Sequence, residues 1–492
     1  MSSGDLKHVL NTNRPRRPDG SLHREGRHQV MEPVQGNATD SPPSDDVWTK
    51  LDRIGALAEQ MPQTALRSLN HCLDSQLMWV AYTLTRRDAA AGVDGETYED
   101  FQIGLFERLD QLVDQAHKGT YRAPPVRRVY IPKGTGQETR PLGIPTFADK
   151  VLQRAVTMIL ERIYEQVFHE GSYGFRKKKS AQQAMDALRN WLIRKGGGIV
   201  LDVDVRKYFD TIDHGHLREF LKRRVADGVL LRLIGKWLKA GVLEAGQLSY
   251  PDEGTPQGGV LSASRRRRRT RAPLLANIYL HYVLDVWFED EIKPTLEGEA
   301  ILIRFADDFV LAFTSERDAQ RVHDLLGPRF AEYGLTIHPE KTRQVRFQRP
   351  GCGQTPDGGA ERPGTFDFLG FTLHWGKTHR GGMTVKTRTA ASRLQRTITR
   401  IDEWCRKNRH GPVPAQCVTL NQKLRGHYNY FGRQGNYYAL SRVYRAAQRV
   451  WKKWLSRRSR ASRASFTWAR FEELHSRHPL LPPRISVGVS SD

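Results

Sequence analysis

The sequence predicts an α+β fold, and three patterns support this class. Residues 198–205 read Gly-Ile-Val-Leu-Asp-Val-Asp-Val, an apolar strand that follows a glycine turn. Residues 301–313 hold two apolar strand runs on either side of two adjacent aspartates, the pattern of a β-hairpin. A helix is predicted over 152–163, where apolar residues recur at i, i+4, i+7 and i+11: Leu152, Val156, Ile159 and Ile163.

Length and composition indicate a soluble globular protein. A chain of 492 residues suggests about three or four packed units. It contains 38% hydrophobic and 27% charged residues, and no apolar run approaches the roughly 18 residues that cross a bilayer. Residues 1–46 mix Pro, Arg, Ser, Asn and Gly without apolar periodicity, so we expect a disordered basic tail.

The charge balance points to a polyanionic partner. Seventy-eight Lys and Arg residues against 54 Asp and Glu residues give a net charge of +24. The cations run through the whole chain and are not confined to one amphipathic helix, which favours nucleic acid over a membrane surface. The four cysteines form neither a CxxC pair nor a zinc-binding spacing, and the N-terminus lacks an apolar signal. We therefore expect a cytoplasmic, nucleoid-associated protein.

Two basic segments are candidate phosphate-binding sites. The stretch 126–145 predicts a hairpin whose arms project Lys133 and Arg140 near one point, suited to a triphosphate. An ordinary solvated hairpin fits these residues equally well. Four cations, Arg176, Lys177, Lys178 and Lys179, precede Ser180, a predicted N-cap, and suit an RNA backbone. A solvated charge run is the alternative there.

Two carboxylate-bearing elements predict a metal site. Strand alternation points Asp202 and Asp204 to one face, and Asp307 and Asp308 occupy the tip of the second hairpin. A plain Asp-rich turn is the alternative for the latter pair. Carboxylates that converge without Cys or His select Mg²⁺. Two such ions would activate a 3′-hydroxyl and stabilise a leaving pyrophosphate, which is nucleotidyl transfer.

Several longer motifs carry a family resemblance. VYIPKGTGQETRPLGIP, YGFR, VDVRKYFDTIDH, GTPQGG, PLLANIYLHYVLD, FADD, GLTIHPEKT and FDFLGFTL occur in this order over roughly residues 75–460. The chain resembles a group II intron-encoded reverse transcriptase/maturase. In that resemblance Asp204 matches the first catalytic aspartate, and Asp307 with Asp308 matches the YADD box. Asp202 matches only a frequent neighbour.

The resemblance also assigns nucleotide-binding roles. Phe209 matches the bulky ring beneath the incoming sugar, which would clash with a 2′-hydroxyl and favour dNTPs; a core Phe is the alternative. Gln257, in Gly254–Gly259, matches a loop near the templating base pair, although the string is also compatible with a simple turn. Lys341 matches a lysine near the pyrophosphate, a candidate general acid, with a surface lysine as the alternative.

A right-hand polymerase architecture follows from the resemblance. It implies fingers over 47–195, a palm with an antiparallel sheet over 196–375, a helical thumb/maturase region over 376–470 and a C-terminal tail over 471–492. Residues 366–370 resemble the primer grip. The segment LRGHYNY resembles the maturase motif and assigns Arg425, Tyr428 and Tyr430 to RNA; the tyrosines stack on unpaired bases or fill the thumb core.

The chain departs from the family in three places. An Arg-rich insert, 263–272, separates GTPQGGVLS from PLLANIYL beside the expected active site, and it puts polymerase activity in doubt. Phe305 replaces the usual Tyr of the YADD box. No Cys/His cluster follows residue 460, so we expect no C-terminal endonuclease and primers made by other means.

The predicted function is that of an RNA-directed DNA polymerase that binds group II intron RNA and assists its splicing and mobility. Its expected cofactor is a pair of Mg²⁺ ions, and its expected partners are intron RNA, an RNA template, a DNA primer, dNTPs and a DNA target. One alternative is a polymerase-inactive, RNA-binding splicing factor, which the insert favours. Another is a domesticated or retron-type defence reverse transcriptase, which the LRGHYNY segment disfavours.

The charge predicts a steep salt dependence of RNA binding. If about six phosphates are contacted, the affinity should fall by about 10³-fold between 50 and 200 mM salt, because each contact releases condensed counterions. Filter binding or fluorescence anisotropy over a salt series measures this. An affinity that does not change with salt would contradict the electrostatic interpretation.

Overall fold

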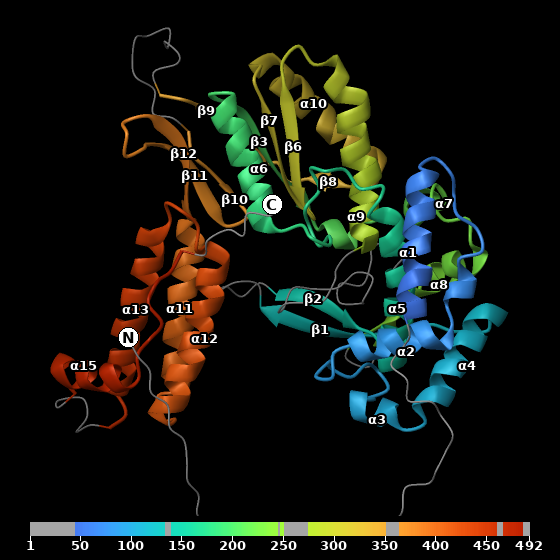
Figure 1. The fold of residues 1–492 in the computed structure, drawn as a ribbon, viewed down its shortest axis with the longest axis horizontal. Coiled ribbons are helices and arrows are strands. Elements are labelled where there is room, and N and C mark those ends of the chain that lie inside the picture. Colours follow the sequence, from blue (N-terminus) through green and yellow to red (C-terminus); the bar gives the residue numbers. More distant parts are fainter. Residues whose placement is uncertain are drawn as a thin grey trace, which may run out of the picture. The chain divides into compact units, whose positions relative to one another are not determined.

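The computed structural model describes residues 45–132, 139–244, 247–249, 274–350, 364–459 and 466–485. Most of the predicted tail and the whole Arg-rich insert therefore lie outside the described residues. The helix α1 (Asp45–Gln60) includes the last two residues of the predicted tail. The predicted α+β class is confirmed: helices combine with sheets whose strands pair antiparallel except for β1 (Val126–Pro132) with β4 (Val242–Glu244) (Figure 1).

A five-stranded sheet organises the middle of the chain. It comprises β3 (Gly197–Arg206), β6 (Ala300–Phe305), β7 (Asp308–Phe313), β8 (Thr336–Ile337) and β9 (Arg343–Gln348). The order is β6-β7-β3-β8, with β9 also paired to β3, and every pairing is antiparallel. β3 is the central strand, so its side chains meet neighbours on both sides.

The two faces of this sheet belong to different hydrophobic cores. Leu201, Val203 and Phe309 pack in one core with α10 (Glu316–Glu332). Val200 and Val310, one residue out of phase, pack in the other core with α6 (Ala181–Arg194). Ser180 caps α6 as predicted, because its hydroxyl accepts a hydrogen bond of 3.2 Å from the Gln183 amide.

The helix α5 (Phe147–Tyr164) shares one hydrophobic core with several other helices. They are α2 (Ser75–Leu84), α3 (Tyr98–Gln102), α4 (Leu105–Lys118), α7 (His214–Lys222), α8 (Gly228–Leu238), α9 (Leu274–Leu280) and the short η1 (Asn70–Cys72) and η2 (Tyr208–Asp210). The apolar stripe predicted for α5 is confirmed, because Leu152, Val156, Ile159 and Ile163 are all buried, but burial extends beyond the stripe. Even Lys150 and Arg154 of this helix are buried, because α1, α2 and α9 cover several of its sides.

The predicted basic hairpin is confirmed in its arms. β1 (Val126–Pro132) pairs with β2 (Thr139–Ile144), and β4 (Val242–Glu244) and β5 (Gln247–Ser249) complete a sheet of order β2-β1-β4-β5. The loop that contains Lys133 lies outside the described residues. Arg140 faces Ile131 in the register of the two strands.

The last part of the chain is a small sheet followed by helices. β10 (Phe366–Phe368), β11 (Phe371–Lys377) and β12 (Met383–Thr389) form an antiparallel sheet. The helices α11 (Ala391–Lys407) and α13 (Tyr437–Leu455) pack with α12 (Val413–Phe431) and α15 (Trp468–Arg477) around a third core. No helix in the described ranges is long and apolar enough to cross a membrane.

A buried ion pair joins the central sheet to the helix beneath it. α9 continues through two π-helical segments, η3 (His281–Asp285) and η4 (Trp287–Ile292), and then η5 (Lys293–Thr295). Arg304 on β6 donates to Asp285 through Nε at 2.7 Å and through Nη2. The two side chains are 0% and 1% exposed. Although burial opposes ionisation, Arg304 and His281 together hold the pKa of the Asp285 carboxyl below its usual value.

Removing one partner of this pair should destabilise the fold strongly. Arg304→Met leaves the Asp285 charge buried without its partner, which should cost about 3–5 kcal/mol of unfolding free energy. The matched control is Arg317→Met, because Arg317 pairs with Glu297 on the surface, where such pairs contribute about 1 kcal/mol or less. Urea denaturation followed by circular dichroism compares them. Equal losses would contradict the structural role of the buried pair.

Candidate active site

The predicted carboxylate hairpin forms as expected. Phe305 and Asp308 are the last paired residues of β6 and β7, so Ala306 and Asp307 make a two-residue turn. Ala306 has φ +61°, a conformation that a residue with a Cβ adopts only when its surroundings hold it there. Asp307 and Asp308 therefore stand at a fixed tip.

Register brings the first acidic strand to the same tip. Asp204 lies directly opposite Asp308 in the β3–β7 ladder, and cross-strand partners project to one face. Asp202 shares that face two residues earlier. Residues separated by about a hundred positions in the sequence thus meet as direct neighbours, the close approach that the sequence predicted for Asp204 and Asp308.

The electrostatics of this face favour a bound cation. Burial, and secondarily the charge of Asp308, raises the pKa of Asp202 to about 7, although Arg343 on β9 opposes that rise. Lys341 places its Nζ 3.1 Å from Oδ2 of Asp204. Like charges directly opposite one another destabilise a sheet, so positive charge beside them is favourable. Lys341 supplies part of this positive charge.

The donor set at the carboxylate tip fits hard divalent cations, although the described part of the chain holds no ready-made ligand cluster. Carboxylate oxygens of Asp204, Asp307 and Asp308 are ligands that Mg²⁺ prefers. Within the described ranges, no three His, Cys, Asp or Glu side chains are arranged to hold a metal ion. The assignment of these three residues as metal ligands stays a prediction.

A glycine segment holds the tip from the side. The stretch Gly171–Gly174 runs along β6: the Tyr173 amide donates to the Arg304 carbonyl and the Arg304 amide to the Gly171 carbonyl, both at 2.8 Å. A Cβ on Gly174 would lie 2.2 Å from the amide nitrogen of Ala306. Only glycine permits this approach. Close packing against the Ala306 turn therefore explains the glycine of the YGFR motif.

Buried polar side chains beneath the tip were missed by sequence reasoning. Arg304 also donates to Oδ1 of Asn277 at 3.1 Å, to the Ala306 carbonyl at 3.2 Å and to Oγ of Ser172 at 2.8 Å. Asn277 in turn donates to the Gly174 carbonyl at 2.7 Å. The sequence does contain a signal for them. An Asn inside the apolar run of α9 and an Arg inside the apolar run of β6 both need buried hydrogen-bond partners.

The remaining nucleotide-binding predictions have mixed outcomes. Phe209 is half-buried in η2, just beyond β3, with its ring 5.2 Å from that of Tyr208. Lys341 lies beside Asp204, and its contact with the pyrophosphate stays a prediction. Lys133 and Gln257 lie outside the described residues, and the side chain of Arg140 is not described.

The four-cation run divides into internal and surface residues. The Arg176 guanidinium donates to Glu165 and to the carbonyls of His169 and Ser172, and its side chain is 6% exposed. The predicted RNA contact at Arg176 is therefore wrong, because its donors are used inside the protein. Lys177 lies 3.8 Å from Glu161, and Lys179 lies over the Tyr173 ring. Lys178 is exposed.

The predicted RNA-contacting tyrosines of α12 make contacts inside the protein. Tyr428 is 0% exposed and donates to the Leu481 carbonyl. A ring buried this way has no free face, so the prediction of base stacking there is wrong. Tyr430 is half-buried, stacks on Phe371 and donates to the Leu369 carbonyl, which fastens α12 to the β10–β11 turn; its contact with RNA stays a prediction. Arg425 is exposed on the same helix.

Comparisons with known proteins agree with this arrangement. The family described as reverse transcriptase (RNA-dependent DNA polymerase) matches residues 131–373. Protein YkfC of Escherichia coli K12 is 39% identical over 272 residues, which cover 49% of this chain and 68% of YkfC. The chain belongs to the reverse transcriptase family.

Relatives of this chain include intron-encoded proteins, which confirms the resemblance drawn from the motifs. The group II intron-encoded protein LtrA of Lactococcus lactis is 38% identical over 235 residues, 47% of this chain. A putative COX1/OXI3 intron 1 protein of Saccharomyces cerevisiae is 33% identical over 224 residues, 45% of this chain. The match spans 37% of LtrA and 25% of the yeast protein.

Filling the space at Gly174 should disturb the carboxylate tip of this reverse transcriptase. Gly174→Ala forces a Cβ against the Ala306 backbone, so we expect a stability loss of about 1–3 kcal/mol and a displaced turn. Gly426→Ala is the matched control: a Cβ there meets nothing within 4 Å, and alanine suits a helix better than glycine. Thermal unfolding compares the two. If Gly174→Ala were as stable as Gly426→Ala, the close approach would be refuted.

Proposed function

We propose that this chain copies RNA into DNA and acts on a group II intron. The observation that carries the proposal is the direct pairing of Asp204 with Asp308, beside Asp307, in a chain of the reverse transcriptase family. The resemblance to intron-encoded relatives supports intron RNA as a partner and splicing and mobility as the outcome. The other proposed partners are an RNA template, a DNA primer, dNTPs and a DNA target. We assign this activity to the cytoplasm, in association with the nucleoid.

In this proposal the chain is divided as a right-hand polymerase. Fingers span 47–195, the palm 196–375 and the thumb/maturase region 376–470, followed by the tail 471–492. Support comes from the antiparallel sheet that carries the carboxylates and from the helical third core that follows it. The β10–β11 turn, which Tyr430 fastens to α12, takes the place of the primer grip.

Asp204, Asp307 and Asp308 would hold two Mg²⁺ ions, which lower the pKa of the attacking 3′-hydroxyl and neutralise charge on the leaving pyrophosphate. The protein's own residues orient the nucleotide. Lys133 and Arg140 bind the triphosphate, and Gln257 approaches the templating base pair. Phe209 excludes the 2′-hydroxyl by contact with C2′ of the sugar.

Lys341 carries a separate role beside the carboxylates. Its Nζ, 3.1 Å from Asp204, holds a proton that it can give to the pyrophosphate oxygen as that oxygen gains charge. While no nucleotide is present, the same ammonium offsets the repulsion between Asp204 and its neighbours. Its exposed position lets it move between the two partners.

Intron RNA binds to cationic surface outside the active site. Two of the predicted RNA-binding cations, Lys178 and Arg425, are exposed, and Lys177 and Lys179 flank Lys178 in the sequence. The helices α11 and α13 also carry Arg and Lys on their solvent faces. Tyr437 and Tyr438, 55% and 72% exposed at the start of α13, offer rings on which unpaired bases can stack.

Primer extension on an RNA template tests the proposal. Asp204→Asn and the double variant Asp307→Ala/Asp308→Ala should each lower dNTP incorporation by at least about 10³-fold, because the negative charge that holds the cations is lost. Asp324→Asn, an exposed carboxylate on α10, is the control and should incorporate dNTPs at the wild-type rate.

Removal of Mg²⁺ with EDTA should abolish extension, and added Mg²⁺ should restore it. If the wild-type chain extends no primer under these conditions yet still promotes splicing of a group II intron, it is a polymerase-inactive splicing factor and the proposal fails. The Arg-rich insert 263–272 is the segment to delete next in that case.

A further inference from the structure

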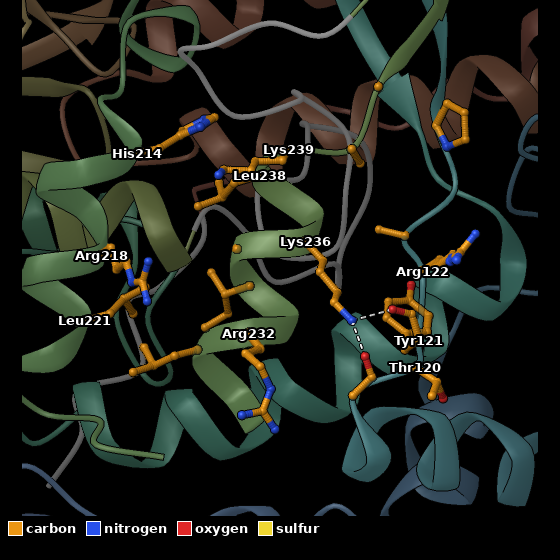
Figure 2. A pocket seen from close by; sticks show the side chains of 18 of the residues that line it. Thr120, Tyr121, Arg122, His214, Arg218, Leu221, Arg232, Lys236, Leu238 and Lys239 are labelled. Carbon is orange, nitrogen blue, oxygen red and sulfur yellow. Dashed lines mark hydrogen bonds between the residues drawn. The ribbon is translucent and has the colours of Figure 1, made fainter. Parts of the chain in front are cut away.

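A concave surface lies around α8. This helix lies between α7 and the segment 119–125, and the three elements line a cavity of about 930 Å³ (Figure 2). We call this surface the α8 groove. Asp204, Asp307, Asp308 and Lys341 are not among its described lining residues. Its volume is near the upper end of the range for pockets that enclose organic ligands, about 300–1,000 Å³.

The groove is lined by one sign of charge. Its described lining includes no Asp or Glu, but it includes five cations, Arg122, Arg218, Arg232, Lys236 and Lys239. Arg232, Lys236 and Lys239 fall at i, i+4 and i+7 of one helical face, which extends over about 10 Å. Cations aligned in this way repel one another, so an anionic ligand that runs along α8 stabilises them.

One wall of the groove is held rigidly. Lys236 donates to the carbonyls of Gly119 and Tyr121 at 2.7 and 2.6 Å (Figure 2). The buried Tyr121 accepts a hydrogen bond from Trp237 Nε1 at 3.1 Å and donates to Asp149. The segment 119–125 is thus fixed to α8 before any ligand arrives, which reduces the entropy lost on binding.

The remaining cations differ from Lys236 in their contacts. Arg122, Arg218, Arg232 and Lys239 are exposed, and no hydrogen bond or ion pair within the described ranges engages their charged ends. Lys236 therefore builds the wall, and these four side chains present donors to the groove.

The floor of the groove is apolar and open. Leu231, Ile234 and Leu238 of α8 contribute to the lining. At Gly235, on the same helix, an added Cβ would meet nothing within 4 Å. A glycine inside a helix costs about 1 kcal/mol relative to alanine, and here it leaves bare backbone between the flanking cations. An apolar floor beneath a cationic rim matches bases and phosphates together.

We propose that the α8 groove binds a short stretch of unpaired nucleic acid, with phosphates on Arg232 and Lys239 and a base over Gly235. The inference deepens the proposed function and rests on it only for nucleic acid as the partner. The groove also adjoins the base of the β1–β2 hairpin, because Pro125 lines it and the next residue begins β1. A strand held there would lead toward the hairpin.

Photo-cross-linking of the full chain tests the proposal. The probe is a single-stranded RNA 12-mer that contains 4-thiouridine, and cross-linked peptides are identified by mass spectrometry. We expect cross-links within 119–125 and 231–239. Gly235→Trp fills the floor without changing charge and should lower the yield at these peptides at least fivefold. Gly235→Ala should keep it, which separates blocking from misfolding.

Charge variants test the phosphate contacts. Arg232→Gln/Lys239→Gln should reduce the slope of log affinity against log salt by about 1.4, since each single-strand phosphate contributes about 0.7. The control Arg53→Gln/Arg67→Gln removes the same charge from exposed residues outside the groove lining and should leave the groove cross-links unchanged. Similar effects of both pairs would overturn the proposal.

Competitors identify the strand. Unlabelled RNA or DNA single strands should each reduce the groove cross-links, and the stronger competitor identifies the natural ligand. Duplex RNA that competes equally, or a yield unaffected by Gly235→Trp, would overturn the proposal. Because cross-linking does not require synthesis, a chain that cross-links in the groove but extends no primer refutes the polymerase alone.

Discussion

The carboxylate tip depends on the buried guanidinium of Arg304. One side chain pairs with Asp285, contacts Ser172 and Asn277, and donates to the carbonyl of the strained Ala306. Its own backbone pairs with the Gly171–Gly174 segment. A charge without access to water must satisfy its donors with fixed partners, so the turn, α9 and the glycine segment are held in a single arrangement. Asp307 and Asp308, which belong to this turn, are held in place with it.

The fold class and the facing carboxylates of β3 and β7 could be predicted, because both depend on the local periodicity of the sequence. Period-2 alternation is sufficient to bring Asp202 and Asp204 to one face, and the paired apolar runs predict the hairpin that faces them. Register then follows, because a slip by one residue would turn Asp204 into a hydrophobic core.

The rest depends on which faces other elements cover, and one sequence does not contain that information. α5 shows an apolar stripe, yet helices bury its Lys150 and Arg154 as well. Arg176 and Tyr428 look like surface RNA contacts by residue type, but tertiary partners from other segments use their polar groups. Asn277 is recognisable in the sequence as a polar residue inside an apolar run, but its hydrogen-bond partners Arg304 and Gly174 are not. The partners of a buried polar group follow from the tertiary arrangement.

The central claim is that Asp204, Asp307 and Asp308 share a pair of divalent cations during synthesis. The most direct measurement is a crystal structure of the full chain with primer, RNA template, an incoming dNTP and Mn²⁺, with the ions located by anomalous scattering. The account predicts two peaks about 3.5–4 Å apart, both in contact with these carboxylates. Peaks bound only to the nucleotide or elsewhere on the protein, with Lys341 still on Asp204, would contradict it.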